Sequence, residues 1–178
     1  MPCIDFAASP IPIPERFRAV RYDGSRYPGT EGGLEAGANC QKFAYEFIRH
    51  YGCVVPDFRS SELWKDTAYT QAVGEPAPAG LEPQDLVLFH KTPDAWGAHA
   101  GVYLGRELVL HLSKQAGHPV LWRFEEFASR PEYAFYIGAK RTLKRASAAG
   151  PVPIPAGTPG STPTTARKGA IPPPPKPR

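Results

Sequence analysis

The sequence predicts an α+β fold, in which one amphipathic helix packs against a small antiparallel β-sheet or half-barrel. Two observations carry this prediction. Apolar residues recur with a helical period over residues 40–51. From residue 86 onward the pattern changes to short apolar runs separated by turn residues, which is typical of a meander of strands.

The helix is expected to begin at Cys40 and to end before Gly52. Its apolar face is formed by Cys40, Phe43, Ala44, Phe47, Ile48 and Tyr51. Asn39 suits the N-cap position, and Gly52 suits the left-handed position that follows a helix. Cys40 then lies in the first turn on the inward face, where the helix dipole favours a thiolate. On the helix alone, an ordinary core cysteine remains the alternative.

The remaining elements are short. A helix is expected after Ser60 or Ser61, followed by a turn-rich link over residues 74–80. Strands are expected at residues 86–89, 98–104, 107–112, 118–122 and 133–137. A last short helix is expected at residues 124–128.

We divide the 178 residues into three parts. Residues 1–26 are expected to form an N-terminal arm and loop, residues 27–145 a catalytic domain, and residues 146–178 a disordered Pro-rich basic tail that is too poor in apolar side chains to fold. Residues 1–139 carry 13 basic and 17 acidic side chains, a net charge of −4, whereas residues 140–178 carry eight basic side chains and no acidic one.

The basic charges of the tail are sparse and are not interleaved with aromatic residues, so we expect no nucleic-acid partner. Four consecutive prolines at 172–175 are of the kind that aromatic-lined grooves recognise. A protein partner for the tail therefore stays open, although such runs often occur without one.

The N-terminal residues lack the pattern of a signal peptide, and no apolar run reaches the length of a membrane span. We therefore expect a cytoplasmic protein, with export by a non-classical route left open. Three cysteines, at 3, 40 and 53, form no CxxC pair, so we expect neither a disulfide framework nor a zinc site.

His99 and His111 are the candidates to act with Cys40. A cysteine nucleophile needs an imidazole as base, and the imidazole needs a polar group that fixes its orientation. The two histidines are twelve residues apart, and a hairpin centred on Gly105 would place them opposite each other on one face. A metal site is the alternative, but no third ligand stands at a recognisable spacing, and we expect no metal or cofactor.

These residues resemble the motifs of the NlpC/P60 cysteine peptidases, which have a small papain-like fold. The resemblance rests on Asn39-Cys40 at the start of a helix, on residues 81–89 (LEPQDLVLF), and on residues 99–105 (HAGVYLG) with a later His111. It implies that Cys40 is the nucleophile, His99 the general base and His111 the residue that orients the base. Tyr27 would correspond to the tyrosine that precedes the cysteine in the family.

The sequence around the cysteine departs from the family. Asn39-Cys40-Gln41-Lys42 stands where the family has Asp-Cys-Ser-Gly. In members that cleave cell-wall peptides, the Asp and Ser help to bind the free amine of the substrate, and a neutral Asn39 cannot pair a cation as a carboxylate does. Besides Tyr27 and Asn39, we expect Trp64 and Trp96 to bind substrate.

The expected function is a cysteine hydrolase that cleaves an amide or isopeptide bond, of which a peptidoglycan-type peptide is one example, through an acyl-enzyme. Its substrate would be a peptide or an acyl-amide. An acyltransferase or deamidase with the same triad is one alternative, and a catalytically silent binding module is another.

Overall fold

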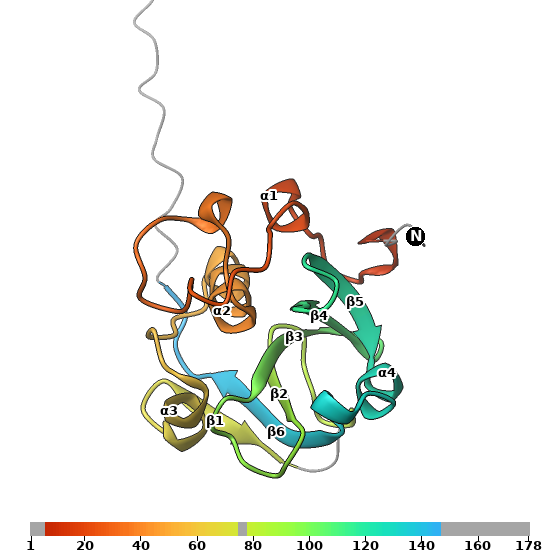
Figure 1. Cartoon of the computed structure of the whole chain (residues 1–178). Coiled ribbons are helices and arrows are strands. Elements are labelled where there is room, and N and C mark those ends of the chain that lie inside the picture. Colours follow the sequence, from red (N-terminus) through yellow and green to blue (C-terminus); the bar gives the residue numbers. More distant parts are fainter. Residues whose placement is uncertain (1–5, 75–77, 147–178) are drawn as a thin grey trace, which may run out of the picture. The chain divides into compact units, whose positions relative to one another are not determined.

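The computed structural model describes residues 6–74 and 78–146. Within them the predicted α+β layout is confirmed, with an antiparallel sheet of six strands in the order β1-β6-β2-β3-β4-β5 and a few helices (Figure 1). The strands are β1 (Thr70–Val73), β2 (Leu86–His90), β3 (His99–Gly105), β4 (Leu108–Leu112), β5 (Pro119–Arg123) and β6 (Phe135–Thr142). The helices are α1 (Glu15–Arg18), α2 (Cys40–His50), α3 (Ser60–Lys65) and α4 (Phe124–Ala128), with 3₁₀ turns η1 (Phe6–Ala8), η2 (Leu34–Ala36) and η3 (Pro131–Tyr133).

Helix α2 forms as predicted. The Asn39 side-chain oxygen accepts a hydrogen bond from the Lys42 backbone N–H at 2.8 Å, which caps the first turn. Gly52 follows the helix with a φ of 83°, a conformation that glycine adopts without a steric cost. Phe43 and Phe47 are fully buried on the inward face.

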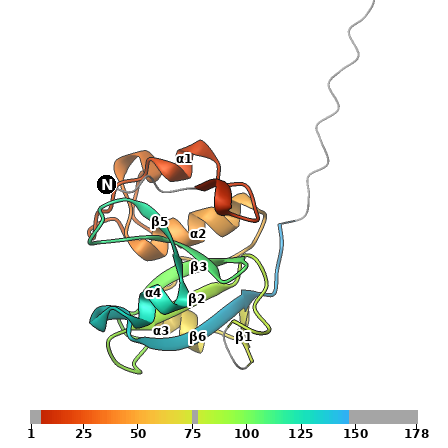
Figure 2. The same ribbon diagram turned by 90° about the vertical axis from the view of Figure 1, so that its right-hand side faces the viewer.

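The sheet separates two apolar cores, and α2 covers only one of its faces (Figure 2). Under α2 lie residues of alternate positions on β3, namely Ala100, Val102 and Leu104. On the other face, Phe89 of β2 stacks on Phe127 of α4 with 4.0 Å between ring centroids. Since side chains alternate along a strand, His99 lies on this second face, away from the body of α2.

The segment before residue 27 belongs to the same core. Ile13, Phe17 and Val20 are buried in the cluster that includes Phe43 and Phe47. The Phe17 ring packs edge-on against Phe47, with 5.0 Å between centroids. The expected boundary between an N-terminal arm and the domain is therefore wrong for the described residues, because the apolar residues of the arm complete the core over α2.

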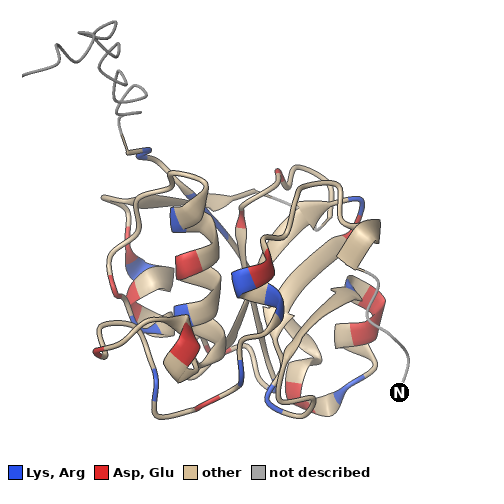
Figure 3. Ribbon diagram, turned by 90° about the horizontal axis from the view of Figure 1, so that it is seen from above, with Lys and Arg blue, Asp and Glu red and all other residues tan. Residues whose placement is uncertain are grey.

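Charged side chains lie mainly on helices and loops, and β2, β3 and β4 contain no Lys, Arg, Asp or Glu (Figure 3). One charged pair does reach the interior: Arg141 of β6 donates to both carboxylate oxygens of the buried Asp85, at 2.8 and 2.7 Å. No helix in the described part of the chain is long and apolar enough to cross a membrane. The expected Pro-rich tail lies, apart from Ala146, outside the described residues.

Candidate active site

Cys40 opens onto a cleft at the first turn of α2. The cleft has a volume of about 480 Å³, within the range of sites for small molecules or short peptide segments. Its other lining residues are Tyr22, Asn39, Gln41, Arg59, Ser60, Ser61, Trp96, Gly97 and Ala98. The candidate nucleophile is thus partly exposed, and solutes reach it through this cleft.

His99 and His111 lie together in the second core. His99 Nε2 and His111 Nδ1 are 2.8 Å apart, and both side chains are buried. The expected register, with the two histidines directly opposite, is wrong: the β3–β4 pairs are Val102 with Leu110 and Tyr103 with Val109. The observed ladder is centred on residue 106 instead of 105, so it differs from the expected register by two residues, which leaves both imidazoles on one face.

Gly101 makes the diagonal contact between the imidazoles possible. Continuing the ladder places Gly101 opposite His111, and a Cβ built on Gly101 would lie 3.4 Å from the Cβ of His111. The same atom would lie only 2.6 Å from Val109 Cγ1. Because residue 101 has no side chain, the His99 ring can reach His111 across it.

The Cys40 thiol lies at the end of β3 that carries His99, where β3 and β4 separate. The β3–β4 ladder begins at Val102 and Leu110, so the strands are not paired beside His99. At that end the backbone N–H of Ala100, next to His99, donates a hydrogen bond to the Cys40 sulfur, which favours the thiolate. No hydrogen bond among the described residues joins the thiol to either imidazole, although such contacts often tighten only when substrate binds.

The three candidate catalytic groups are neutral at neutral pH. Burial raises the pKa of the Cys40 thiol, and the backbone N–H groups of Ala100, Gln41 and Cys40 oppose this without reversing it. Burial lowers the pKa of His99 to about 3. The helix N-terminus favours the thiolate, as expected, but desolvation of the thiol outweighs these backbone groups.

His111 is enclosed by aromatic rings. Its centroid lies 4.3 Å from that of Trp122 and 4.8 Å from that of Phe127. The pKa of His111 lies well below its usual range, mainly because the ring is buried. A charge on His99 and the guanidinium of Arg130 lower it further. His111 Nε2 is buried without a hydrogen-bond partner among the described residues. His111 is therefore suited to orient His99 as a neutral group and not to carry a charge itself.

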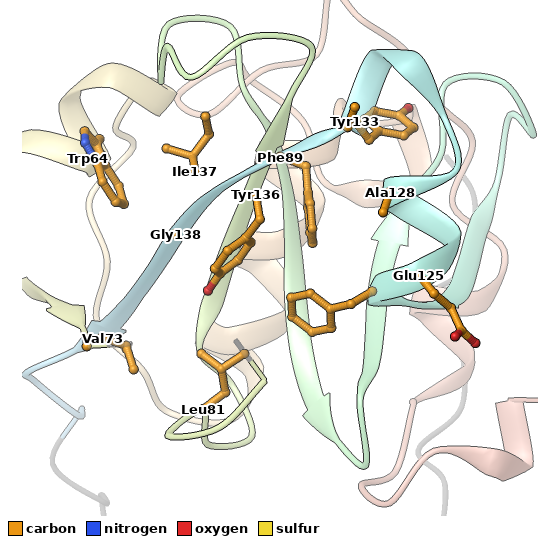
Figure 4. Close-up of a pocket in the computed structure, with 13 residues that line it drawn as sticks. Trp64, Val73, Leu81, Phe89, Glu125, Ala128, Tyr133, Tyr136, Ile137 and Gly138 are labelled. Atoms are coloured by element: carbon orange, nitrogen blue, oxygen red, sulfur yellow. The ribbon is translucent and has the colours of Figure 1, made fainter. Parts of the chain in front are cut away.

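The expected substrate-binding residues divide between places. Asn39 and Trp96 line the cleft, and Trp96 is 74% exposed there. Trp64 instead packs beside Gly138 and lines a separate cavity of about 590 Å³ on the β6 side of the sheet (Figure 4). Tyr27 does not line the cleft either, but its ring lies under the guanidinium of Arg59, 3.6 Å from ring centroid to Cζ.

Tyr22, which sequence reasoning missed, is the tyrosine in the cleft. A parallel bridge between Tyr22 and Ala38 places it beside the start of α2. Burial and then the charge of a Cys40 thiolate raise the pKa of Tyr22. Both Tyr22 and Tyr27 precede the cysteine in the sequence, so position along the chain does not distinguish them. Tyr133 approaches from η3, and burial and then the Cys40 charge raise its pKa to about 12.

The other histidines lie in different surroundings, with His50 beside Arg16, His90 beside Thr92 and His118 beside the Pro119 carbonyl. Among the described residues, no group of three or more His, Cys, Asp or Glu side chains is placed to hold a metal ion.

A scan against models of protein families and a search of curated proteins return no match for this chain.

Proposed function

We propose that this chain is a cysteine hydrolase of the NlpC/P60 type, with Cys40 as nucleophile, His99 as general base and His111 as the residue that orients it. The observation that carries the proposal is the buried His99–His111 pair, whose ring nitrogens are 2.8 Å apart, with His99 next to Ala100, whose backbone N–H donates to the Cys40 sulfur. The papain-like arrangement of helix and sheet and a cytoplasmic location belong to the same proposal.

The mechanism uses one of the two proton arrangements that the hydrogen bond between the imidazoles allows. In the reactive tautomer, His99 Nε2–H donates to His111 Nδ1, and the lone pair of His99 Nδ1 is free to accept the thiol proton. His111 then carries its own proton on Nε2, where aromatic rings accept an N–H as a weak donor. The apolar surroundings disfavour a positive charge on His111. A proton taken from the thiol therefore stays on His99.

The first half of the reaction forms an acyl-enzyme. As Cys40 Sγ attacks the carbonyl carbon, its proton passes to His99 Nδ1, and the carbonyl π electrons move to the oxygen. Backbone N–H groups of the first turn of α2 and the Tyr22 hydroxyl stabilise this oxyanion. The C–N bond then breaks, and the leaving amine takes the proton from His99.

The second half releases the acyl group. Water attacks the thioester carbonyl while His99 accepts its proton, and the C–S bond breaks to regenerate the thiol and a free acid. The substrate is accordingly a peptide or acyl-amide. Attack by another nucleophile instead of water would give the acyltransferase alternative with the same residues.

The proposal is tested by acylation with p-nitrophenyl acetate, in a protein whose other cysteines carry Cys3→Ser and Cys53→Ala. We expect a stoichiometric burst of p-nitrophenolate and one acetyl group on Cys40, located by mass spectrometry of the digest. Cys40→Ser should abolish the burst, and His99→Gln should slow acylation by about 10²–10⁴-fold.

The pH dependence tests the lowered pKa of His99. Because the pKa of the Cys40 thiol is raised and that of His99 is lowered, acylation assisted by His99 should persist into acidic solution and decline only as His99 becomes protonated. Equal burst rates in the parent and His99→Gln proteins would instead support a silent binding module.

A further inference from the structure

The cleft beside Cys40 carries one charged side chain, and it is cationic. Of the residues that line the cleft, Arg59 alone is ionised at neutral pH, and no Asp or Glu is among them. Asn39, at the start of α2, contributes a neutral amide where a carboxylate would have balanced the Arg59 charge. The described wall of the cleft is therefore positively charged beside the thiol.

Arg59 is also held in place. Its guanidinium lies over the Tyr27 ring at 3.6 Å from the centroid, and a cation stacked in this way loses less conformational freedom when it binds a ligand. No ion pair between Arg59 and a carboxylate occurs among the described residues. A planar guanidinium with open donors is the side chain that best matches a carboxylate in two-point contact.

We propose that the cleft selects substrates that carry a carboxylate near the scissile bond, with Arg59 as the binding residue and Tyr27 as the residue that positions it. This inference rests on the proposed function for the identity of the scissile bond. It reverses the polarity expected of a site that binds a free amine. Trp96, exposed on the rim, adds an apolar surface for the part of the substrate next to the carboxylate.

Two alkylating reagents of nearly the same size test the charge preference directly. Iodoacetate transfers a carboxymethyl group and iodoacetamide a carbamoylmethyl group to Cys40 Sγ: an S–C bond forms, the C–I bond breaks, iodide leaves and the thiol proton passes to the solvent. Only iodoacetate is an anion. We use the ratio of their second-order rate constants at one pH, in the Cys3→Ser/Cys53→Ala protein. Charges far from the cleft act on iodoacetate alike in the parent and in Arg59→Lys, which have the same net charge, so that pair controls for them.

The ratio of iodoacetate to iodoacetamide should fall about fivefold in Arg59→Gln, the change expected when a partly exposed ion pair is lost. Asn39→Asp should lower it in the same direction, because a carboxylate then stands beside the thiol while the helix cap is kept. Arg59→Lys, which keeps the charge, should retain most of the ratio. Tyr27→Leu should lower it less than Arg59→Gln, and added salt should reduce the difference between the parent and Arg59→Gln.

The inference is overturned if Arg59→Gln leaves the ratio unchanged, or if the parent ratio does not exceed that of Arg59→Gln at low salt. Its failure is distinguishable from failure of the proposed function, because alkylation needs no acyl chemistry. A burst with p-nitrophenyl acetate together with an unchanged ratio keeps the hydrolase and rejects the carboxylate preference. A ratio that depends on Arg59 together with no burst keeps the carboxylate preference of the cleft and rejects the hydrolase.

Discussion

At the scale of single residues, the site is defined by bases that burial keeps uncharged. His99 and His111 share a hydrogen bond and are surrounded by Phe127 and Tyr133, so a proton added to the pair would be desolvated. A neutral imidazole serves as a base over a wide pH range, but it makes the fold sensitive to acid. The pair therefore links the chemistry of the site to the stability of the chain.

We predict that acid destabilises the protein through these two histidines. Their folded-state pKa values lie below the value of about 6.5 that they have when unfolded. As the pH falls below about 6.5, the unfolded chain binds protons that the folded chain refuses, and each histidine lowers the free energy of unfolding by up to about 1.4 kcal/mol per pH unit. For His99 this loss continues until the pH approaches its folded pKa of about 3.

Urea unfolding of the parent and of His111→Leu between pH 7.5 and 4.5 measures the effect. The variant should lose stability less steeply, by up to the contribution of one histidine. Asp23 and Asp66 have lowered pKa values, so their contribution to stability is lost mainly below about pH 4, outside this range, and in both proteins alike. Parallel curves for the two proteins would show that His111 takes up a proton in the folded state.

At the scale of residues, the sequence was sufficient to predict that His99 and His111 lie together and insufficient to give their protonation. Position on an element follows from local pattern, which one sequence shows. The pKa of a buried group depends on how completely the other elements exclude water from it, and that depends on packing over the whole domain. For the same reason Tyr22 was missed, since its place beside Cys40 depends on a bridge to Ala38.

At the scale of elements, β3 and β4 position the histidines, and the hairpin between them determines the register. Arg106 and Glu107 both have positive φ, as a two-residue type I′ turn requires, but neither is the Asn or Gly by which such a turn is usually recognised in a sequence. The strands themselves were predictable from their apolar runs. The two-residue difference in register and the short strand β1, which pairs with β6 only at the edge of the sheet, were not.

Gly101 is the position on β3 where the hairpin and the site depend on each other. We predict that Gly101→Ala lowers the free energy of unfolding by about 1–3 kcal/mol, because the new Cβ would meet Val109 Cγ1 at 2.6 Å and the strands have to shift. The same shift should separate His99 from His111 and slow acetylation of Cys40.

Gly74→Ala is the matched control, since a Cβ there meets nothing within 4 Å. It should change stability by less than about 0.5 kcal/mol. Urea unfolding and the p-nitrophenyl acetate burst are measured on both variants. A Gly101→Ala protein that equals the control in both measurements would show that the diagonal contact does not need an empty position 101.

At the scale of the whole molecule, α2 packs against both the sheet and the N-terminal segment. Strands β2, β3 and β4 pack on its inward face, and the segment with Ile13, Phe17 and Val20 completes the same core. Sequence reasoning found the first contact, because a helix with one apolar face needs a sheet to cover it. It missed the second, since α1 has only four residues and shows no period long enough to recognise.

The two ends of the chain should therefore respond differently to deletion. Removing residues 2–20 takes away three buried side chains and exposes the rings of Phe43 and Phe47, so we expect a chain that does not fold cooperatively. The single change Phe17→Ala should lower the free energy of unfolding by about 3–5 kcal/mol, as truncation of other buried phenylalanines does.

Removing residues 150–178, whose sequence is too poor in apolar residues to add to a core, should shift the melting midpoint by at most about 1–2 °C. Thermal unfolding followed by circular dichroism, on the full chain and the three variants, measures all of these effects. A stable protein without residues 2–20 would restore the boundary at residue 27, and a large loss on removal of residues 150–178 would mean that the basic Pro-rich end contributes to the fold.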